Sequence, residues 1–221
     1  MEFELSFSPV NIEKIDFQKG QLGQFISTYT YGNFPDLSEA DVVIIGVPEY
    51  RGTECNGDEV SLMSIRKEIH QLYQGQERLR IADLGNLLLG ETTKDTFQLL
   101  ADVIEECERR GYFSLVLGGG QDATFAQYKS CVQQNKMCNM IAVDSSFDLG
   151  VNDQELGSDS YLNHILNYQP NFLFNYSNIG YQSYLVSQLS IKLIEDLFFD
   201  AYRIGEIRNS LEEIEPIVRN A

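Results

Sequence analysis

The sequence predicts an α/β protein of three layers, α/β/α, in which the sheet is mainly parallel and doubly wound. Short apolar runs typical of strands recur along the chain, and amphipathic stretches long enough for crossover helices separate them. The 221 residues contain no Pro/Gly/Ser linker, repeat or low-complexity tract, so we expect a single domain over residues 1–221. The predicted strands are 42–47, 79–84, 113–117, 140–144, 173–179 and 201–204. We expect the first five to lie parallel in one sheet.

Two helices are predicted on either side of the strand at 113–117. The first carries an apolar face at helical spacing, formed by Phe97, Leu100, Ile104 and Cys107. A capping box of Thr92 and Asp95 starts this helix, and Gly111 is placed to end it. The second helix starts near Asp122 or Thr124. Its predicted inward residues are Phe125, Tyr128 and Val132.

Composition and charge exclude several classes of protein. The chain has 16 Lys and Arg against 33 Asp and Glu, a net charge of −17, which disfavours binding to nucleic acid. Its apolar runs are too short to span a membrane and its N-terminus has no basic signal region, so we expect a cytoplasmic protein. The four cysteines form no CxxC pair and are expected to be free, buried thiols.

A glycine turn links the strand at 113–117 to the next helix. In open α/β sheets, ligands bind outside the carboxyl ends of strands, where this turn of Gly118 to Asp122 is placed. Freed backbone N–H groups at such a turn suit a phosphate. However, no GxGxxG pattern is present and Asp122 is itself an anion, so a purely structural turn remains the alternative.

Two carboxylates follow the strand at 140–144. Asp144 and Asp148 are four residues apart and leave the sheet at its carboxyl edge. Oxygen ligands of this kind suit a hard cation, and these two residues are the candidate metal ligands. The alternative is that Asp144 caps the strand end or forms a salt bridge. We expect Gly119, Gly120, Gln121, Asp122 and Ser146 to line the same cleft.

Several motifs in the right order resemble the ureohydrolase family of arginase, agmatinase and formimidoylglutamase. The motifs are DVVIIGVP at 41–48, SIRKEIHQLY at 64–73, ADLGN at 82–86, LGGGQDAT at 117–124 and AVD at 142–144 followed by Asp148. The later runs 171–182 and 199–206 are most similar to a formimidoylglutamase-like branch. The resemblance implies an arginase-like fold and hydrolysis of a guanidino or formimino C–N bond by hydroxide held between two manganese ions.

Departures from the family pattern fall on the implied metal ligands. The family's first motif, Gly-Gly-Asp-His-Ser, places its histidine on Gln121, with Gly120 in place of the aspartate. The second, Asp-Ala-His-x-Asp, matches Asp144 and Asp148 but has Ser146 where its histidine belongs. The third motif would follow Ala221, together with a further strand and helices. We therefore expect an impaired or inactive hydrolase that binds manganese weakly or not at all.

Two other functions remain open. The chain is alternatively a scaffold, or a protein that binds a small amino-acid-like ligand in the former active-site cleft. A mononuclear magnesium or calcium site of Asp122, Asp144 and Asp148 is the third hypothesis. His70 is expected on a helix surface or in contact with a partner, and His164 outside any catalytic position. Sheet and helix surface left uncovered at the C-terminus predicts a dimer or larger assembly.

Overall fold

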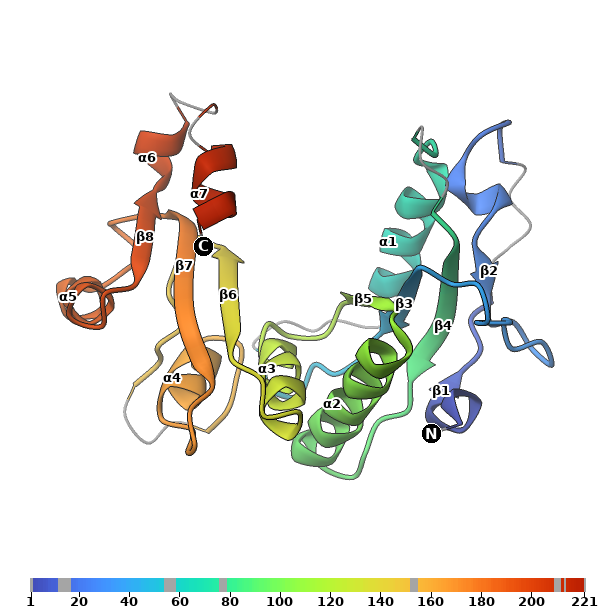
Figure 1. Ribbon diagram of the computed structural model, residues 1–221, viewed down its shortest axis with the longest axis horizontal. Helices are drawn as coiled ribbons and strands as arrows, with labels where there is room; N and C mark the ends of the chain where they lie inside the picture. The colour runs from blue at the N-terminus through green and yellow to red at the C-terminus, as the bar shows by residue number, and fades with distance from the viewer. Residues whose placement is uncertain are drawn as a thin grey trace. The chain divides into compact units, whose positions relative to one another are not determined.

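The computed structural model describes residues 2–11, 17–53, 59–75, 79–151, 155–208, 212 and 214–220. The chain divides into two compact units, Met1–Ser130 and Cys131–Ala221 (Figure 1). Within the described residues, no helix is long and apolar enough to cross a membrane.

The first unit is built on a sheet of five strands. Its strands are β1 (Phe7–Ser8), β2 (Ser27–Thr28), β3 (Val42–Gly46), β4 (Ile81–Leu87) and β5 (Phe113–Leu117). The order is β1-β4-β3-β5, with β2 pairing with β4 as well. The pairs β3–β4, β3–β5 and β2–β4 are parallel, and only β1–β4 is antiparallel.

The helices of the first unit follow from this strand order. A short 3-10 helix, η1 (Phe3–Ser6), precedes β1, and η2 (Leu22–Gln24) precedes β2. Helix α1 (Glu59–Gln71) connects β3 to β4, and α2 (Thr93–Arg110) connects β4 back past β3 to β5. Parallel crossovers are right-handed, so two that run in opposite directions place their helices on opposite faces. This arrangement is the predicted doubly wound pattern.

Helix α2 forms as its sequence predicts. Thr92 is the N-cap, and its side chain and that of Asp95 form a reciprocal capping box. Gly111 ends the helix in the left-handed region at φ 84°. Four residues of the predicted apolar face are at most 3% exposed: Phe97, Leu100, Ile104 and Cys107.

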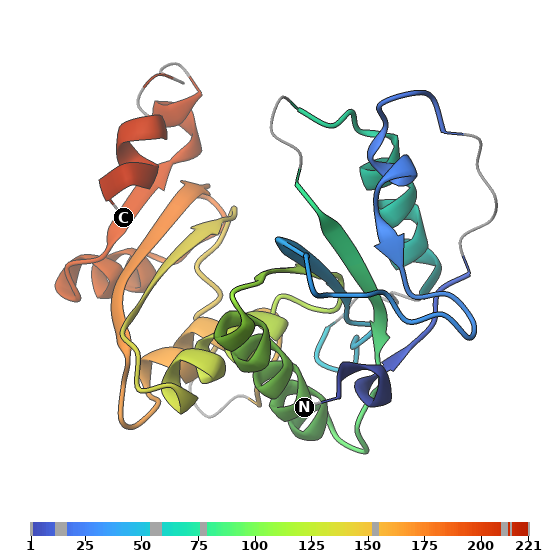
Figure 2. The ribbon, with the colours of Figure 1, turned by 45° about the vertical axis from the view of Figure 1, so that its right-hand side comes forward.

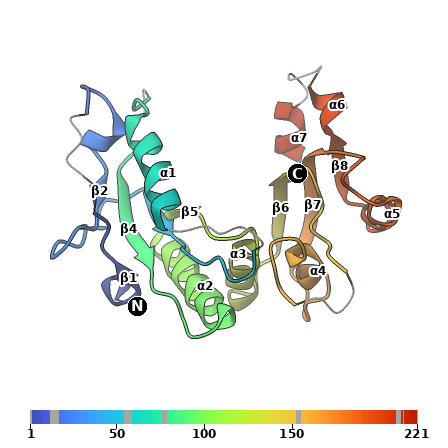
Figure 3. The same ribbon diagram turned by 180° about the vertical axis from the view of Figure 1, so that it is seen from behind.

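The second unit has a sheet of three parallel strands in the order β6-β7-β8, which lie side by side in Figure 3. These are β6 (Cys138–Val143), β7 (Leu173–Tyr181) and β8 (Asp200–Arg203). Helix α4 (Tyr161–Leu166) lies between β6 and β7 in the sequence, and α5 (Gln188–Asp196) connects β7 to β8 and packs beside it (Figure 2). The chain continues through α6 (Ile204–Ile207) and α7 (Ile214–Asn220).

Helix α3 (Ala123–Gln133) follows the glycine turn and includes the residue at which the first unit ends. It starts where the sequence predicts, and Tyr128 is buried, whereas Phe125 and Val132 are only half-buried. Its buried residues are small or polar at three of four positions: Ala123, Ala126 and Ser130, with Tyr128 as the fourth.

All six predicted strands form, with ends that move by no more than a few residues. No two of them pair antiparallel. The expectation that five of them share one sheet is wrong at the level of strand pairing, because they pair in two sheets, one in each unit. The predicted α/β arrangement with a mostly parallel, doubly wound sheet is confirmed.

Candidate functional site

The glycine turn packs tightly against the segment that follows β3. Gly118 and Gly119 have φ values of 77° and 73°, in the region that favours glycine. A Cβ on Gly118 would overlap the Leu62 side chain, and one on Gly119 would lie 3.0 Å from Val47 O. The N–H of Gly120 donates to Glu49 O at 3.0 Å. Close backbone packing accounts for these glycines without a bound phosphate.

The two polar residues that end this turn lie in different environments. The side chain of Gln121 is exposed, whereas Asp122 is fully buried. Backbone hydrogen bonds continue directly into α3, since Phe125 N–H donates to Asp122 O at 2.9 Å. Both residues directly precede α3, where Gln121 is exposed to solvent and Asp122 is buried.

The candidate metal ligands Asp144 and Asp148 are held by a network of short-range hydrogen bonds in the second unit. The Ser146 hydroxyl donates to Asp148 Oδ1 at 2.6 Å, and the Ser146 N–H donates to Asp144 Oδ1 at 3.2 Å. Asn178 Nδ2 donates to Ser146 O at 2.9 Å and ties the segment to β7. Asp148 adopts φ 49°, a left-handed conformation that aspartate tolerates better than most residues. Ser146 thus joins the two carboxylates.

Burial and charge make Asp148 an unusual carboxyl group. Burial raises its pKa to about 6, the hydrogen bond from Ser146 lowers it in part, and the neighbouring Asp144 raises it again. Asp148 Oδ2 and Asn178 Oδ1 are buried and accept no hydrogen bond from the residues that the structure describes. Two acceptors therefore face the interior of this unit without a donor of their own, a costly arrangement that a bound donor or cation would relieve.

The second unit offers a small set of possible metal ligands at this segment, two carboxylates and a hydroxyl. No group of three or more His, Cys, Asp or Glu side chains gathers in the described part of the chain. Imidazole is a preferred ligand for manganese, and a serine hydroxyl is a poorer one. The unpartnered Asp148 Oδ2 is an oxygen of the kind that suits a hard cation.

The predicted site residues are divided between the two units. Gly119, Gly120, Gln121 and Asp122 belong to the first, and Asp144, Ser146 and Asp148 belong to the second. The structure brings the second group together. The expected convergence of both groups in one cleft stays a prediction, and so does the mononuclear site that includes Asp122.

A buried polar cluster on α1 was missed by the sequence interpretation. Arg66 is 1% exposed and donates to both carboxylate oxygens of Asp83, with Nε 2.7 Å from Oδ2. It also donates to Asn86 Oδ1 at 2.8 Å and to Gly85 O at 2.9 Å. Gly46 leaves room for this guanidinium, because a Cβ there would lie 2.5 Å from Arg66 Nη2. Four hydrogen bonds thus fix α1 to the end of β4.

The expectation that His70 lies on a helix surface is wrong. His70 is 3% exposed and lies on the same buried helix face as Arg66, whereas Leu72 is 58% exposed. Burial lowers the pKa of His70, and the charges of Asp83 and Arg66 act in opposite directions. Its Nε2 has no hydrogen-bond partner among the described residues, and its ring packs edge-on against Phe17. The buried face of α1 carries polar residues because Asp83 of β4 supplies the negative charge that pairs with Arg66.

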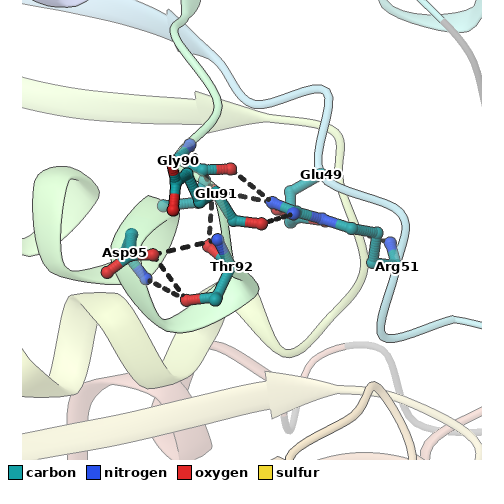
Figure 4. Close-up of polar contacts among 7 residues, drawn as sticks. Glu49, Arg51, Gly90, Glu91, Thr92 and Asp95 are labelled. Carbon is teal, nitrogen blue, oxygen red and sulfur yellow. Dashed lines mark hydrogen bonds and ion pairs between the residues drawn. The ribbon is translucent and has the colours of Figure 1, made fainter.

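A second ion pair fixes the loop after β3 to the start of α2 (Figure 4). Glu49 is 1% exposed, and Arg51 donates to it from both its side chain and its backbone N–H, with Nε 2.9 Å from Oε1. Arg51 also donates to Gly90 O and Glu91 O. Burial would raise the pKa of Glu49, but the hydrogen bonds from Arg51 outweigh it and lower the pKa. Glu49 is therefore a structural anion.

The fold and the strand-end segments define an α/β protein whose polar residues follow the carboxyl ends of parallel strands. Residues 40–220 match the family model described as the Arginase family. Because this match covers most of the sequence, the chain belongs to the arginase family. The sequence resemblance to that family is confirmed.

Solved structures show the same fold. Trypanosoma cruzi formiminoglutamase with Mn2+ is 20% identical with a TM-score of 0.69, over 80% of this chain and 65% of that one. Formimidoylglutamase from Bacillus subtilis is 14% identical with a TM-score of 0.74, over 96% of this chain and 69% of that one. The chain thus spans about two thirds of the length of these proteins. No curated protein matches it.

Proposed function

We propose that this chain keeps the arginase-family fold around a depleted metal site and has at most residual hydrolase activity on guanidino or formimino compounds. The observation that carries the proposal is the Ser146 hydroxyl, which lies where the family resemblance implies an imidazole and donates to Asp148 Oδ1 at 2.6 Å. A hydroxyl donor makes Asp148 part of a local network. An imidazole would instead offer a lone pair to a metal.

Manganese binding by the purified full chain tests this proposal. We expect well below one manganese per chain after equilibration with micromolar metal, and no turnover of arginine, agmatine or formiminoglutamate. The variant Ser146→His restores the implied imidazole of the second unit and should bind manganese more tightly. Adding Asp148→Asn to this variant should remove the gain. About two bound manganese ions in the unaltered chain would refute the proposal.

A second function is favoured by the two unpartnered acceptors of the second unit. Asn178 is fully buried, and its Oδ1, like Asp148 Oδ2, accepts no hydrogen bond from the described residues. An ammonium or amidinium group supplies several N–H donors and a positive charge to such oxygens. We therefore propose, as the alternative, a non-catalytic protein that binds a small amino-acid-like cation at this segment.

Calorimetric titration with agmatine and arginine separates this alternative from the first proposal. Binding without turnover, lost in Asn178→Leu, supports a ligand-binding protein. The matched variant Asn163→Leu changes an asparagine of α4 whose amide oxygen accepts from Asn167, and it should bind as the unaltered chain does. Absence of binding by the unaltered chain at millimolar ligand would exclude the alternative.

Self-association is also proposed. Several large apolar side chains of the second unit are more than 70% exposed, namely Val143, Phe174, Tyr184, Leu189 and Phe198. Such side chains are frequent in interfaces between protein chains. Sedimentation equilibrium should give a mass of at least twice 25.1 kDa. A monomer at about 100 µM, where even weak dimers form, would contradict this proposal.

A further inference from the structure

Two cysteines lie at the ends of the connection between α3 and β6. Cys131 is in the last turn of α3, and Cys138 is the first residue of β6. Asn135 adopts φ 52°, and its N–H donates to Val132 O at 3.0 Å. Lys136 N–H then donates to Cys131 O, also at 3.0 Å. This left-handed helix end reverses the chain and returns Cys138 to the side of Cys131.

The two thiols are in direct contact. A side-chain hydrogen bond joins Cys138 to Cys131, and both residues are half-buried and free of any disulfide. This hydrogen bond, together with burial, raises the pKa of Cys138. Cys107 differs because it is 0% exposed and burial raises its pKa to about 12. Cys55 lies outside the described residues.

We propose that Cys131 and Cys138 form an oxidisable dithiol that small-molecule disulfides convert into an intramolecular disulfide. Thiols that contact each other within one unit need little backbone movement to reach disulfide geometry. Half-burial leaves a path for a small oxidant, which the fully buried Cys107 lacks. Six residues separate the two cysteines, so no sequence motif indicates this pair.

The reaction proceeds in two exchange steps. The Cys131 thiolate attacks a disulfide RSSR, its sulfur bonds to one RS group, and the other leaves as RS⁻. Cys138 then loses its proton and attacks the Cys131 sulfur, which forms the Cys131–Cys138 bond and expels the second RS⁻. Both leaving thiolates take up the two protons that the cysteines lost. The protein is oxidised by two electrons and RSSR is reduced to two RSH.

Peptide mapping of the full chain tests the proposal. A Cys55→Ser background removes the cysteine that the structure does not describe. The protein is treated with oxidised glutathione at about pH 8.5, near the ordinary pKa of a thiol, and free thiols are then alkylated. Trypsin cleaves after Lys129, Lys136 and Lys192, so the disulfide must link peptide 130–136 to peptide 137–192. We expect this linked pair, with Cys107 alkylated only after denaturation.

Single variants establish the order of the two steps. Cys138→Ser should accumulate a stable glutathione adduct on Cys131. Cys131→Ser should react more slowly, because no mixed disulfide forms at position 131 for Cys138 to attack. Circular dichroism confirms that each variant is folded. The proposal is overturned if both cysteines remain alkylatable in the folded background protein. It is also overturned if that protein retains glutathione on Cys131 while Cys138 stays free, because the two sulfurs then cannot bond.

Discussion

Replacing Arg66 with Met is expected to be the most destabilising single change in the first unit. Methionine keeps much of the side-chain volume but removes the charge that neutralises Asp83, which is 0% exposed. Asn86 Oδ1 and Gly85 O lose a donor in the same step. Among the described residues, the Asp83 side chain would retain only the Gly85 N–H, which donates to its Oδ1 at 2.9 Å.

The magnitude follows from burial. Breaking a buried pair by removing one partner costs about 3–5 kcal/mol, because an uncompensated charge stays inside the protein. A matched control lies directly before β3 and β4: Arg80 and Asp41 form a similarly short pair, at 2.8 Å, with side chains 56% and 37% exposed. The pKa of Asp41 is lowered to about 2, mainly by the hydrogen bond from Arg80. Even so, water screens this pair, and Arg80→Met should lose far less stability than Arg66→Met.

Urea denaturation followed by far-UV circular dichroism measures both variants, since the chain has no Trp for fluorescence. With a urea slope of about 2 kcal/mol per M, the midpoint of Arg66→Met should fall by about 2 M. The double variant Arg66→Met/Asp83→Asn removes both charges and should be more stable than the sum of the single losses predicts. If Arg66→Met loses no more stability than Arg80→Met, the assignment of Arg66 as a buried structural cation is wrong.

Three further predictions concern local features. The unfolded chain protonates His70 near pH 6.5 and the folded chain only at lower pH, so the free energy of unfolding should fall below pH 6.5 by up to about 1.4 kcal/mol per pH unit. Urea titrations at several pH values should show this slope reduced in His70→Leu. Phe198 is 92% exposed at φ 59°, so Phe198→Gly should raise stability by about 1 kcal/mol in thermal melts, with a smaller gain for Asn135→Gly. Gly46→Ala should cost about 1–3 kcal/mol in urea titrations, because its Cβ would enter the space of Arg66; an unchanged midpoint would contradict that packing.

Much of the fold was predictable because local signals and tertiary structure agree. Helix α2 has its capping box, its apolar face and its terminal glycine in the sequence, and all three serve the same function in the structure. Helix α1 was misjudged for a physical reason. A period of 3.6 residues identifies an apolar face, but the buried stripe of α1 contains Arg66 and His70. Asp83, which carries the opposite charge, is 17 residues from Arg66 in the sequence. A local sequence pattern cannot show that two residues so far apart form a pair.

The sequence names residues of the candidate site, and it says less about their contacts. Asp144 and Asp148 were singled out from the sequence, and both accept hydrogen bonds from Ser146 in the structure. The participation of Asn178 was not foreseen, because it follows from the parallel pairing of β6 with β7, which aligns Ala142 with Asn178. The strand also carries Asn175 and Ser177, so the sequence does not distinguish Asn178 from residues that form ordinary structural hydrogen bonds.

Ser146 determines what this site can still do. Its hydroxyl engages one oxygen of Asp148 and its carbonyl engages Asn178, so the segment is held in place without a metal. The second oxygen of Asp148 is buried and has no donor among the described residues, and such an oxygen costs stability. If the segment served only for packing, a buried charged oxygen would not stabilise it. The variant Asp148→Asn supplies a neutral side chain of the same shape. If Asp148→Asn raises the stability of the protein and removes binding of every cation tested, the carboxylate is retained for a ligand.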